Sequence, residues 1–221
     1  MRRRRAVLVF IRSVIGLLLM AGAVGANVDY TLSREQPAVS QSVGSDALTE
    51  LESLEVKGRA PKTGFSRDEF GSGWKTVQGC STRDIILNRD LENVMVTDNC
   101  TVESGLLRDP YTGEDILFSR KDSSKVQIDH VVALSDAWQK GAQNLSEEDR
   151  EQLANDPIEL WAVSGAANQA KSDGDAATWL PKNKTFRCEY VERQIVIKKK
   201  YSLWVTDAEK QAMRGVLQSC A

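Results

Sequence analysis

The spacing of apolar residues divides the chain into a series of short helices and strands. Leu48, Leu51 and Leu54 recur every three residues, which predicts a helix over residues 46–56. The predicted helices cover residues 46–56, 84–91, 135–142, 146–154, 166–172, 184–200 and the stretch after Thr206; the predicted strands cover 94–96, 100–102, 126–132 and 158–163, with a hairpin over 106–118. No internal repeat is present. The pattern therefore predicts an α+β protein with a β-hairpin region first and helices at the C-terminus.

Short polar motifs mark several of these boundaries. Residues 109–113 read Asp-Pro-Tyr-Thr-Gly, a composition typical of the turn in a hairpin. Ser146 precedes an amphipathic stretch and is followed three residues later by Asp149, which predicts a capped helix start. Thr206 and Glu209 have the spacing of a capping box, so a final helix is expected to begin there.

The N-terminus has the layout of a secretory signal. Arg2–Arg5 form a positive segment, and a run of apolar and small residues then continues to Ala26, which predicts cleavage after Ala23 or Ala26. The alternative is an uncleaved membrane anchor that starts at Ala6. Arg12 would lie within that anchor, and the apolar stretch beyond it is shorter than the ~20 residues of a spanning helix.

The resulting domain organisation has three parts. Residues 1–26 are the predicted signal peptide, residues 27–45 a flexible linker, and residues 46–221 a single domain. Within that domain, residues 57–62 are interpreted as a turn or an extended link. We expect a secreted monomer with no stable membrane association once the signal is removed.

The predicted mature chain is acidic as a whole but contains one basic segment. Removal of residues 1–26 takes away five arginines and no acids, so the net charge falls from −2 to −7. A uniformly basic nucleic-acid-binding protein is thereby excluded. The segment 165–205 carries an excess of basic residues, namely Lys171, Lys182, Lys184, Arg187, Arg193, Lys198, Lys199 and Lys200. This segment is either a track for a polyanion or a solvated helix face.

Four cysteines lie in the predicted mature region, as expected in an oxidising compartment. Three pairings are open to them. We favour Cys80–Cys100 and Cys188–Cys220, because each bond then closes within one local unit and an antiparallel pair of C-terminal helices would bring the second pair together. A zinc site is the alternative, but no Cys-x-x-Cys pair is present and the one histidine is distant in sequence.

The candidate chemistry centres on His130, which is the sole histidine and directly follows Asp129 on a predicted strand. A second strand leads into a short helix on which Asn168 and Lys171 share a face. A carboxylate and an amide oxygen suit a hard cation such as Mg²⁺. A histidine base, one such metal and a nearby lysine suit phosphodiester hydrolysis.

These pieces resemble a known family. Ile-Asp-His-Val-Val at 128–132, Asn-Gln-Ala-Lys-Ser-Asp at 168–173 and Trp-Leu-Pro at 179–181 are similar to the HNH (His-Me finger) nucleases. The nearest resemblance is to secreted bacterial HNH endonucleases related to the C-terminal domain of GmrSD restriction enzymes, and it runs from about residue 51 to 220. The resemblance implies a ββα-metal core.

The resemblance also implies roles for matching residues. His130 would activate water, while Asp129 and Asn168 would hold one divalent metal, Mg²⁺ first and Mn²⁺ second. Lys171 would lie close to a phosphate or orient an acidic neighbour. The middle Asn of the HNH triplet falls near Glu159 here. In the family that Asn braces the loop, so this departure bears on local geometry rather than on the reaction.

Arg83 is a further candidate for binding substrate, because it lies close to Cys80 and a guanidinium suits a phosphate. The alternative is a surface arginine paired with Asp84 or Glu92.

Three functions are consistent with these residues. The first is a secreted, non-specific or weakly specific endonuclease that acts on DNA, with RNA as the alternative substrate. The second is a secreted nucleic-acid-binding module of the same fold without turnover, for which the departure at Glu159 is the one supporting sequence feature. The third is a metal-dependent hydrolase of small phosphoesters. A purely structural role for His130 is the remaining alternative.

Overall fold

The structure is a computed structural model that describes residues 43–220, with side chains from Asp46. The predicted signal peptide, and the predicted linker as far as residue 42, lie outside the described residues. All described residues belong to the second of the two units into which the chain divides, Val39–Ala221.

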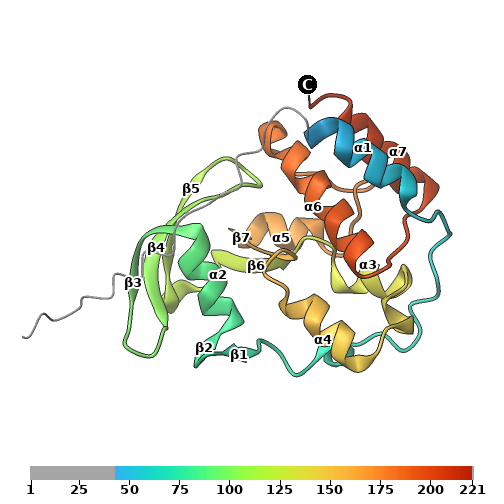
Figure 1. Cartoon of the computed structure of the whole chain (residues 1–221). Coiled ribbons are helices and arrows are strands. Elements are labelled where there is room, and N and C mark those ends of the chain that lie inside the picture. The colour runs from blue at the N-terminus through green and yellow to red at the C-terminus, as the bar shows by residue number, and fades with distance from the viewer. Residues whose placement is uncertain (1–42, 221) are drawn as a thin grey trace, which may run out of the picture. The chain divides into compact units, whose positions relative to one another are not determined.

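Helices and short strands alternate along this unit (Figure 1). The helices are α1 (Val43–Ser53), α2 (Thr82–Asp90), α3 (Leu134–Gln139), α4 (Glu147–Asn155), α5 (Gly165–Lys171), α6 (Arg187–Lys200) and α7 (Asp207–Leu217), with 3-10 turns η1 (Arg67–Phe70), η2 (Arg120–Asp122), η3 (Ala142–Asn144) and η4 (Lys184–Phe186). The strands are β1 (Thr76–Val77), β2 (Cys80–Ser81), β3 (Leu91–Val96), β4 (Val102–Arg108), β5 (Asp115–Ser119), β6 (Val126–His130) and β7 (Leu160–Ser164). The predicted α+β class is confirmed.

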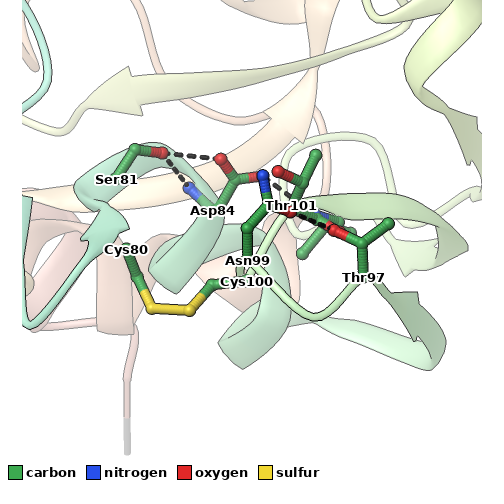
Figure 2. The surroundings of a disulfide bond; sticks show 8 residues. Cys80, Ser81, Asp84, Thr97, Asn99, Cys100 and Thr101 are labelled. Carbon is green, nitrogen blue, oxygen red and sulfur yellow. Dashed lines mark hydrogen bonds between the residues drawn. A yellow bond between two sulfur atoms is a disulfide. The ribbon is translucent and has the colours of Figure 1, made fainter.

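A three-stranded antiparallel sheet, ordered β3-β4-β5, packs with α2 on one side of the unit. A disulfide links Cys80 to Cys100 and so joins the start of α2 to the loop before β4 (Figure 2). Asp84 strengthens this junction: its backbone N–H donates to the Ser81 hydroxyl that caps α2, and its carboxylate accepts from the Val102 N–H at 3.0 Å. The predicted hairpin is thereby fastened to the helix that precedes it.

Helices α1, α6 and α7 lie side by side at the other end (Figure 1). The expected capping box of Thr206 and Glu209 opens α7. A second disulfide links Cys188, near the start of α6, to Cys220, just beyond α7. Both disulfides join the cysteines that the sequence favoured as pairs.

Strands β6 and β7 form a two-stranded antiparallel ladder in which Asp129 pairs with Trp161 and His130 with Leu160. The chain passes from β7 straight into α5, whose first residue is Gly165. A Cβ atom there would lie 2.0 Å from the Ser124 carbonyl oxygen, so glycine is required for this close approach. This strand–strand–helix arrangement positions α5 beside the end of β6.

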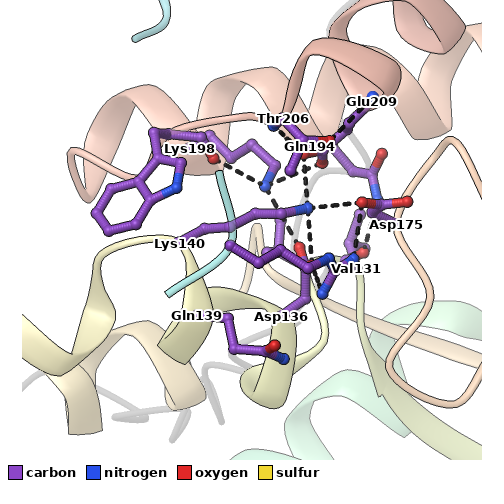
Figure 3. Close-up of polar contacts among 12 residues, drawn as sticks. Val131, Asp136, Gln139, Lys140, Asp175, Gln194, Lys198, Thr206 and Glu209 are labelled. Atoms are coloured by element: carbon purple, nitrogen blue, oxygen red, sulfur yellow. Dashed lines mark hydrogen bonds and ion pairs between the residues drawn. The ribbon is translucent and has the colours of Figure 1, made fainter. Parts of the chain in front are cut away.

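Six charged side chains meet and connect the helical elements: Asp136, Asp175, Glu209, Lys140, Lys198 and Arg59, hereafter the ion cluster. Figure 3 labels all of them except Arg59. Lys140 is fully buried, and its Nζ lies 2.7 Å from Asp136, 2.8 Å from Asp175 and 2.6 Å from Glu209. The three acids balance the three bases, so the cluster is neutral as a whole.

Across residues 43–220, no helix is both long enough and apolar enough to cross a membrane.

Candidate active site

A pocket of about 410 Å³ lies at the C-terminal end of β6. Its lining comes from β6, the start of α3, α5 with the turn after it, and the segment before η1. The lining residues are Lys62, Phe65, Arg67, Gln127, Ile128, Asp129, His130, Ala133, Leu134, Ser135, Asn168, Gln169, Ser172 and Asp173. Asp129, His130 and Asn168, which the sequence singled out, therefore share one pocket.

Asp129 is buried, and both of its carboxylate oxygens are engaged. Oδ1 accepts from the Lys171 ammonium at 3.0 Å, and Oδ2 accepts from the Tyr111 hydroxyl. Burial raises the pKa of the Asp129 carboxyl, while the Lys171 charge and the Tyr111 hydrogen bond oppose that shift. The Tyr111 hydroxyl remains a donor because burial, together with the Asp129 charge, raises its own pKa well above the usual value.

Lys171 acts on this carboxylate from inside the protein. Its Nζ is fully buried and donates to Asp129 and, at 2.7 Å, to the His130 backbone carbonyl. It is absent from the pocket lining. The expected phosphate contact of Lys171 does not fit this position, whereas the alternative of orienting an acidic neighbour does.

His130 is held by two neighbours. Its Nε2 lies 3.0 Å from the Ala154 carbonyl oxygen, and its ring is stacked on Trp74 with centroids 5.7 Å apart. A carbonyl only accepts, so the Nε2 atom carries the proton and Nδ1 is the free base of the neutral ring. Burial lowers the pKa of His130 to about 3, and the charges of Arg67 and Lys171 add to that effect. The imidazole is therefore neutral at pH 7.

Glu159 supports the loop that follows His130. Its carboxylate is completely buried and accepts from the Val132 N–H at 3.1 and 3.3 Å, while its backbone carbonyl accepts from the Val131 N–H at 2.8 Å. Burial raises the pKa of Glu159 well above its usual value. Since Glu159 does not line the pocket, it braces the loop and is not positioned to contact a metal there.

The donor set for a metal is one carboxylate and one amide. The Asn168 Nδ2 donates to the Gln127 Oε1 at 3.0 Å, which leaves the Asn168 Oδ1 without a hydrogen bond among the described side chains. Each oxygen of Asp129 retains a lone pair beyond its one donor. No group of three or more His, Cys, Asp or Glu within residues 46–220 forms a metal site. Two protein oxygens with water around them fit Mg²⁺, which keeps several waters.

Arg83 does not reach this pocket. Its guanidinium lies 3.5 Å from the Val126 carbonyl, at the opposite end of β6. The alternative partners are also taken, because Asp84 pairs with Arg120 and Glu92 with Arg108. Burial lowers the pKa of Arg83, with the Arg120 charge contributing.

The basic segment 165–205 loses most of its free charge to internal pairs. The pairs are Lys171 with Asp129, Arg193 with Glu189, Lys198 with Asp136 and Glu209, Lys199 with Glu50, and Lys200 with Asp156. Of its eight basic residues, only Lys182, Lys184 and Arg187 make no ion pair within the described part of the chain. The segment therefore does not form a continuous track of free positive charges for a polyanion.

Four residues around the pocket were not identified as candidates from the sequence: Lys62, Phe65, Arg67 and Trp74. They lie in a stretch of turns and 3-10 helix with no hydrophobic periodicity, in which the sequence predicts no helix or strand. Aromatic and basic residues in a long irregular segment were the one available signal.

Residues 82–216 match the family described as GmrSD restriction endonucleases, C-terminal domain. A protein of the fungus Arthroderma benhamiae, described as an uncharacterized secreted protein, is 39% identical over 179 residues, which cover 80% of this chain and 85% of that protein. This relative is fungal, whereas the sequence motifs had suggested bacterial relatives. No solved structure matches the chain significantly.

Proposed function

The chain belongs to the family of GmrSD restriction endonuclease C-terminal domains, and from that premise we propose that it is a secreted, metal-dependent endonuclease of the HNH type. The observation that carries the proposal is the shared pocket of Asp129, His130 and Asn168 at the end of β6, with α5 beside it. Secretion is supported by the secreted relative and by the two disulfides.

His130 is the general base of this proposal. The Ala154 carbonyl holds the proton on Nε2, so Nδ1 is free to take a proton from the attacking water. The Trp74 ring fixes the plane of the imidazole. Because burial keeps His130 neutral at pH 7, the Nδ1 lone pair is unprotonated there.

Asp129 and Asn168 would hold one divalent cation, Mg²⁺ or Mn²⁺, through a carboxylate and an amide oxygen. A cation bound there supplies positive charge that stabilises the negative charge developing on the phosphodiester. Lys171 and Tyr111 are positioning residues that fix the direction of the Asp129 carboxylate. The substrate is nucleic acid, with DNA as the first candidate and RNA as the second.

Nicking of supercoiled plasmid by the mature protein tests this function in Mg²⁺, Mn²⁺ and EDTA. We expect cleavage that requires metal and falls at least about 100-fold in a His130 variant. Since the ring is buried and hydrogen-bonded, His130→Ala also removes a structural contact; His130→Gln, whose amide can still donate to Ala154, is the better variant.

A folded His130→Gln protein that cleaves as fast as the wild type would refute the assignment of the base. Absence of cleavage by the folded wild type in either metal would refute the endonuclease.

A further inference from the structure

The pocket has a wall that lies outside the region matched by the family. Lys62, Phe65 and Arg67 line it together with His130 and Asn168, yet the family match begins only at residue 82. The sequence analysis interpreted the beginning of this stretch, residues 57–62, as a turn or an extended link. Its position in the structure is instead that of a binding element.

The wall segment, residues 57–70, is fixed along its length. The Lys57 N–H donates to the Val205 carbonyl at 3.0 Å and the Ala60 N–H to the Gln139 carbonyl at 2.8 Å. The Trp138 indole donates to the Thr63 carbonyl at 3.3 Å. These contacts anchor the segment to the helical part of the protein, so its side chains are held in place before any ligand arrives.

Aromatic packing and ion pairs continue the anchoring on both sides of the pocket. The Phe65 ring packs edge-on against Trp138 with centroids 6.2 Å apart. Lys62 pairs with Asp173 at 3.1 Å, which ties the wall to the turn after α5. On the far side, Glu69 pairs with Arg150.

Arg67 differs from every other arginine within residues 46–220. Each of the other nine makes an ion pair or a hydrogen bond, whereas the exposed guanidinium of Arg67 makes neither. The neighbouring Asp68 lines a different pocket with Glu147 and Glu151, and no ion pair joins it to Arg67 in the described part of the chain.

The ion pairs around the pocket leave Arg67 as its uncompensated charge. Asp129 is compensated by Lys171 and Asp173 by Lys62. The charged residues of the lining, Lys62, Arg67, Asp129 and Asp173, sum to zero, and with Lys171 behind the lining paired to Asp129, Arg67 is the one charge of the lining without an ion-pair partner. In a chain of net charge −2, this is the local feature that attracts an anion to the candidate active site.

We propose that Arg67 binds a backbone phosphate of the nucleic-acid substrate and that the wall segment 57–70 is the element that presents it. This inference rests on the proposed nuclease function and adds to it a substrate-binding residue. A planar guanidinium with no internal partner can offer two parallel N–H donors to one phosphate group.

Binding of a fluorescent DNA duplex to the non-cleaving His130→Gln protein tests the assignment separately from turnover. We expect Arg67→Ala in that background to raise Kd at least about tenfold. The slope of log Kd against log salt should fall by about 0.9, which corresponds to one lost phosphate contact. Arg67→Lys should retain the slope and lose only part of the affinity.

Arg108→Ala is the matched control, because Arg108 is an exposed arginine of β4 outside the pocket lining. It should leave both Kd and slope unchanged. In the cleaving protein, Arg67→Ala should raise KM more than it lowers kcat, with no change in melting temperature because the side chain has no internal partner.

The outcomes separate this inference from the proposed function. Metal-dependent cleavage with an unchanged Kd and salt slope in Arg67→Ala would overturn the inference and leave the nuclease standing. An equal loss of affinity in Arg108→Ala would also overturn it, since overall charge would then explain the effect. Neither binding nor cleavage by folded wild-type protein would overturn both.

Discussion

Substitution of Lys140 by methionine tests whether the ion cluster stabilises the helical part of the protein. Lys140 is fully buried and contacts the carboxylates of Asp136, Asp175 and Glu209 within 2.8 Å. Methionine has a similar length and keeps most of the apolar packing. The change therefore removes the charge and leaves three buried acids facing two bases, Arg59 and Lys198.

The magnitude follows from that imbalance. Removal of one partner from a buried ion pair costs about 3–5 kcal/mol, because the other charge remains buried and uncompensated. A domain of this size has a total stability of about 5–15 kcal/mol, so the loss should be a large fraction of it. We expect Lys140→Met to lower the free energy of unfolding at pH 7 by about 3–5 kcal/mol, measured by urea denaturation with both disulfides intact.

The pH dependence of the free energy of unfolding provides a second, independent test of the ion cluster. Burial alone would raise the pKa of Asp175, but the hydrogen bond and charge of Lys140, together with Arg59, lower it to about 2 from its usual 3.8. A lowered carboxyl pKa contributes stability above pH 3.8 that is lost as the pH falls toward 2, and this shift is worth about 2 kcal/mol. In Lys140→Met the pKa of Asp175 should return to its usual value or above, so the cost of the substitution should shrink by at least about 1 kcal/mol between pH 7 and pH 3.

Lys199→Met is the matched control, because its ion pair with Glu50 is half exposed. It should cost less than about 1 kcal/mol at any pH. A cost below about 1 kcal/mol for Lys140→Met at pH 7 would refute the reasoning, as would a cost that does not change with pH.

Two further substitutions test the surroundings of His130. Glu159→Gln should keep wild-type stability and cleavage, whereas Glu159→Ala should lose about 2–4 kcal/mol in urea denaturation because the buried Val132 N–H loses its acceptor and a cavity opens; equal stability of the two variants would contradict the bracing role. Trp74→Ala should lower kcat about three- to tenfold with little change in KM, since an aromatic stack of about 0.5–1.5 kcal/mol no longer fixes the imidazole, and an unchanged kcat in plasmid nicking would rule this out.

The sequence predicts those parts of the fold whose signals are local. The Asp109–Gly113 turn, the Ser146 cap and the Thr206 capping box are each complete within a few residues, and each is found in the structure. The favoured cysteine pairs also rest on short separations, 20 residues for Cys80–Cys100 and 32 for the second pair.

Sequence patterns do not identify ion-pair partners that are distant along the chain. Lys171 and Lys198 belong to the same basic segment as Lys184, yet the first two are buried in ion pairs with Asp129 and Asp136, which lie 42 and 62 residues away in sequence. A run of charges does not reveal which members are compensated. For the same reason the sequence left open whether Arg83, close to Cys80, binds phosphate or pairs at the surface, whereas Arg67, from an irregular segment, is the arginine that lines the pocket.

Glu159 bears directly on the choice between a nuclease and a binding module without turnover. The departure from Asn at this position was the one sequence feature in favour of the binding module. In the structure the Glu159 carboxylate accepts the Val132 N–H, and an amide oxygen could accept the same bond. Burial raises the pKa of Glu159 and so favours its neutral, protonated form. In that form the carbonyl oxygen of the side chain can still accept the hydrogen bond. The backbone carbonyl of Glu159 also accepts from the Val131 N–H, so this residue holds the loop after His130 through two contacts. The replacement of Asn by Glu therefore keeps the support of that loop.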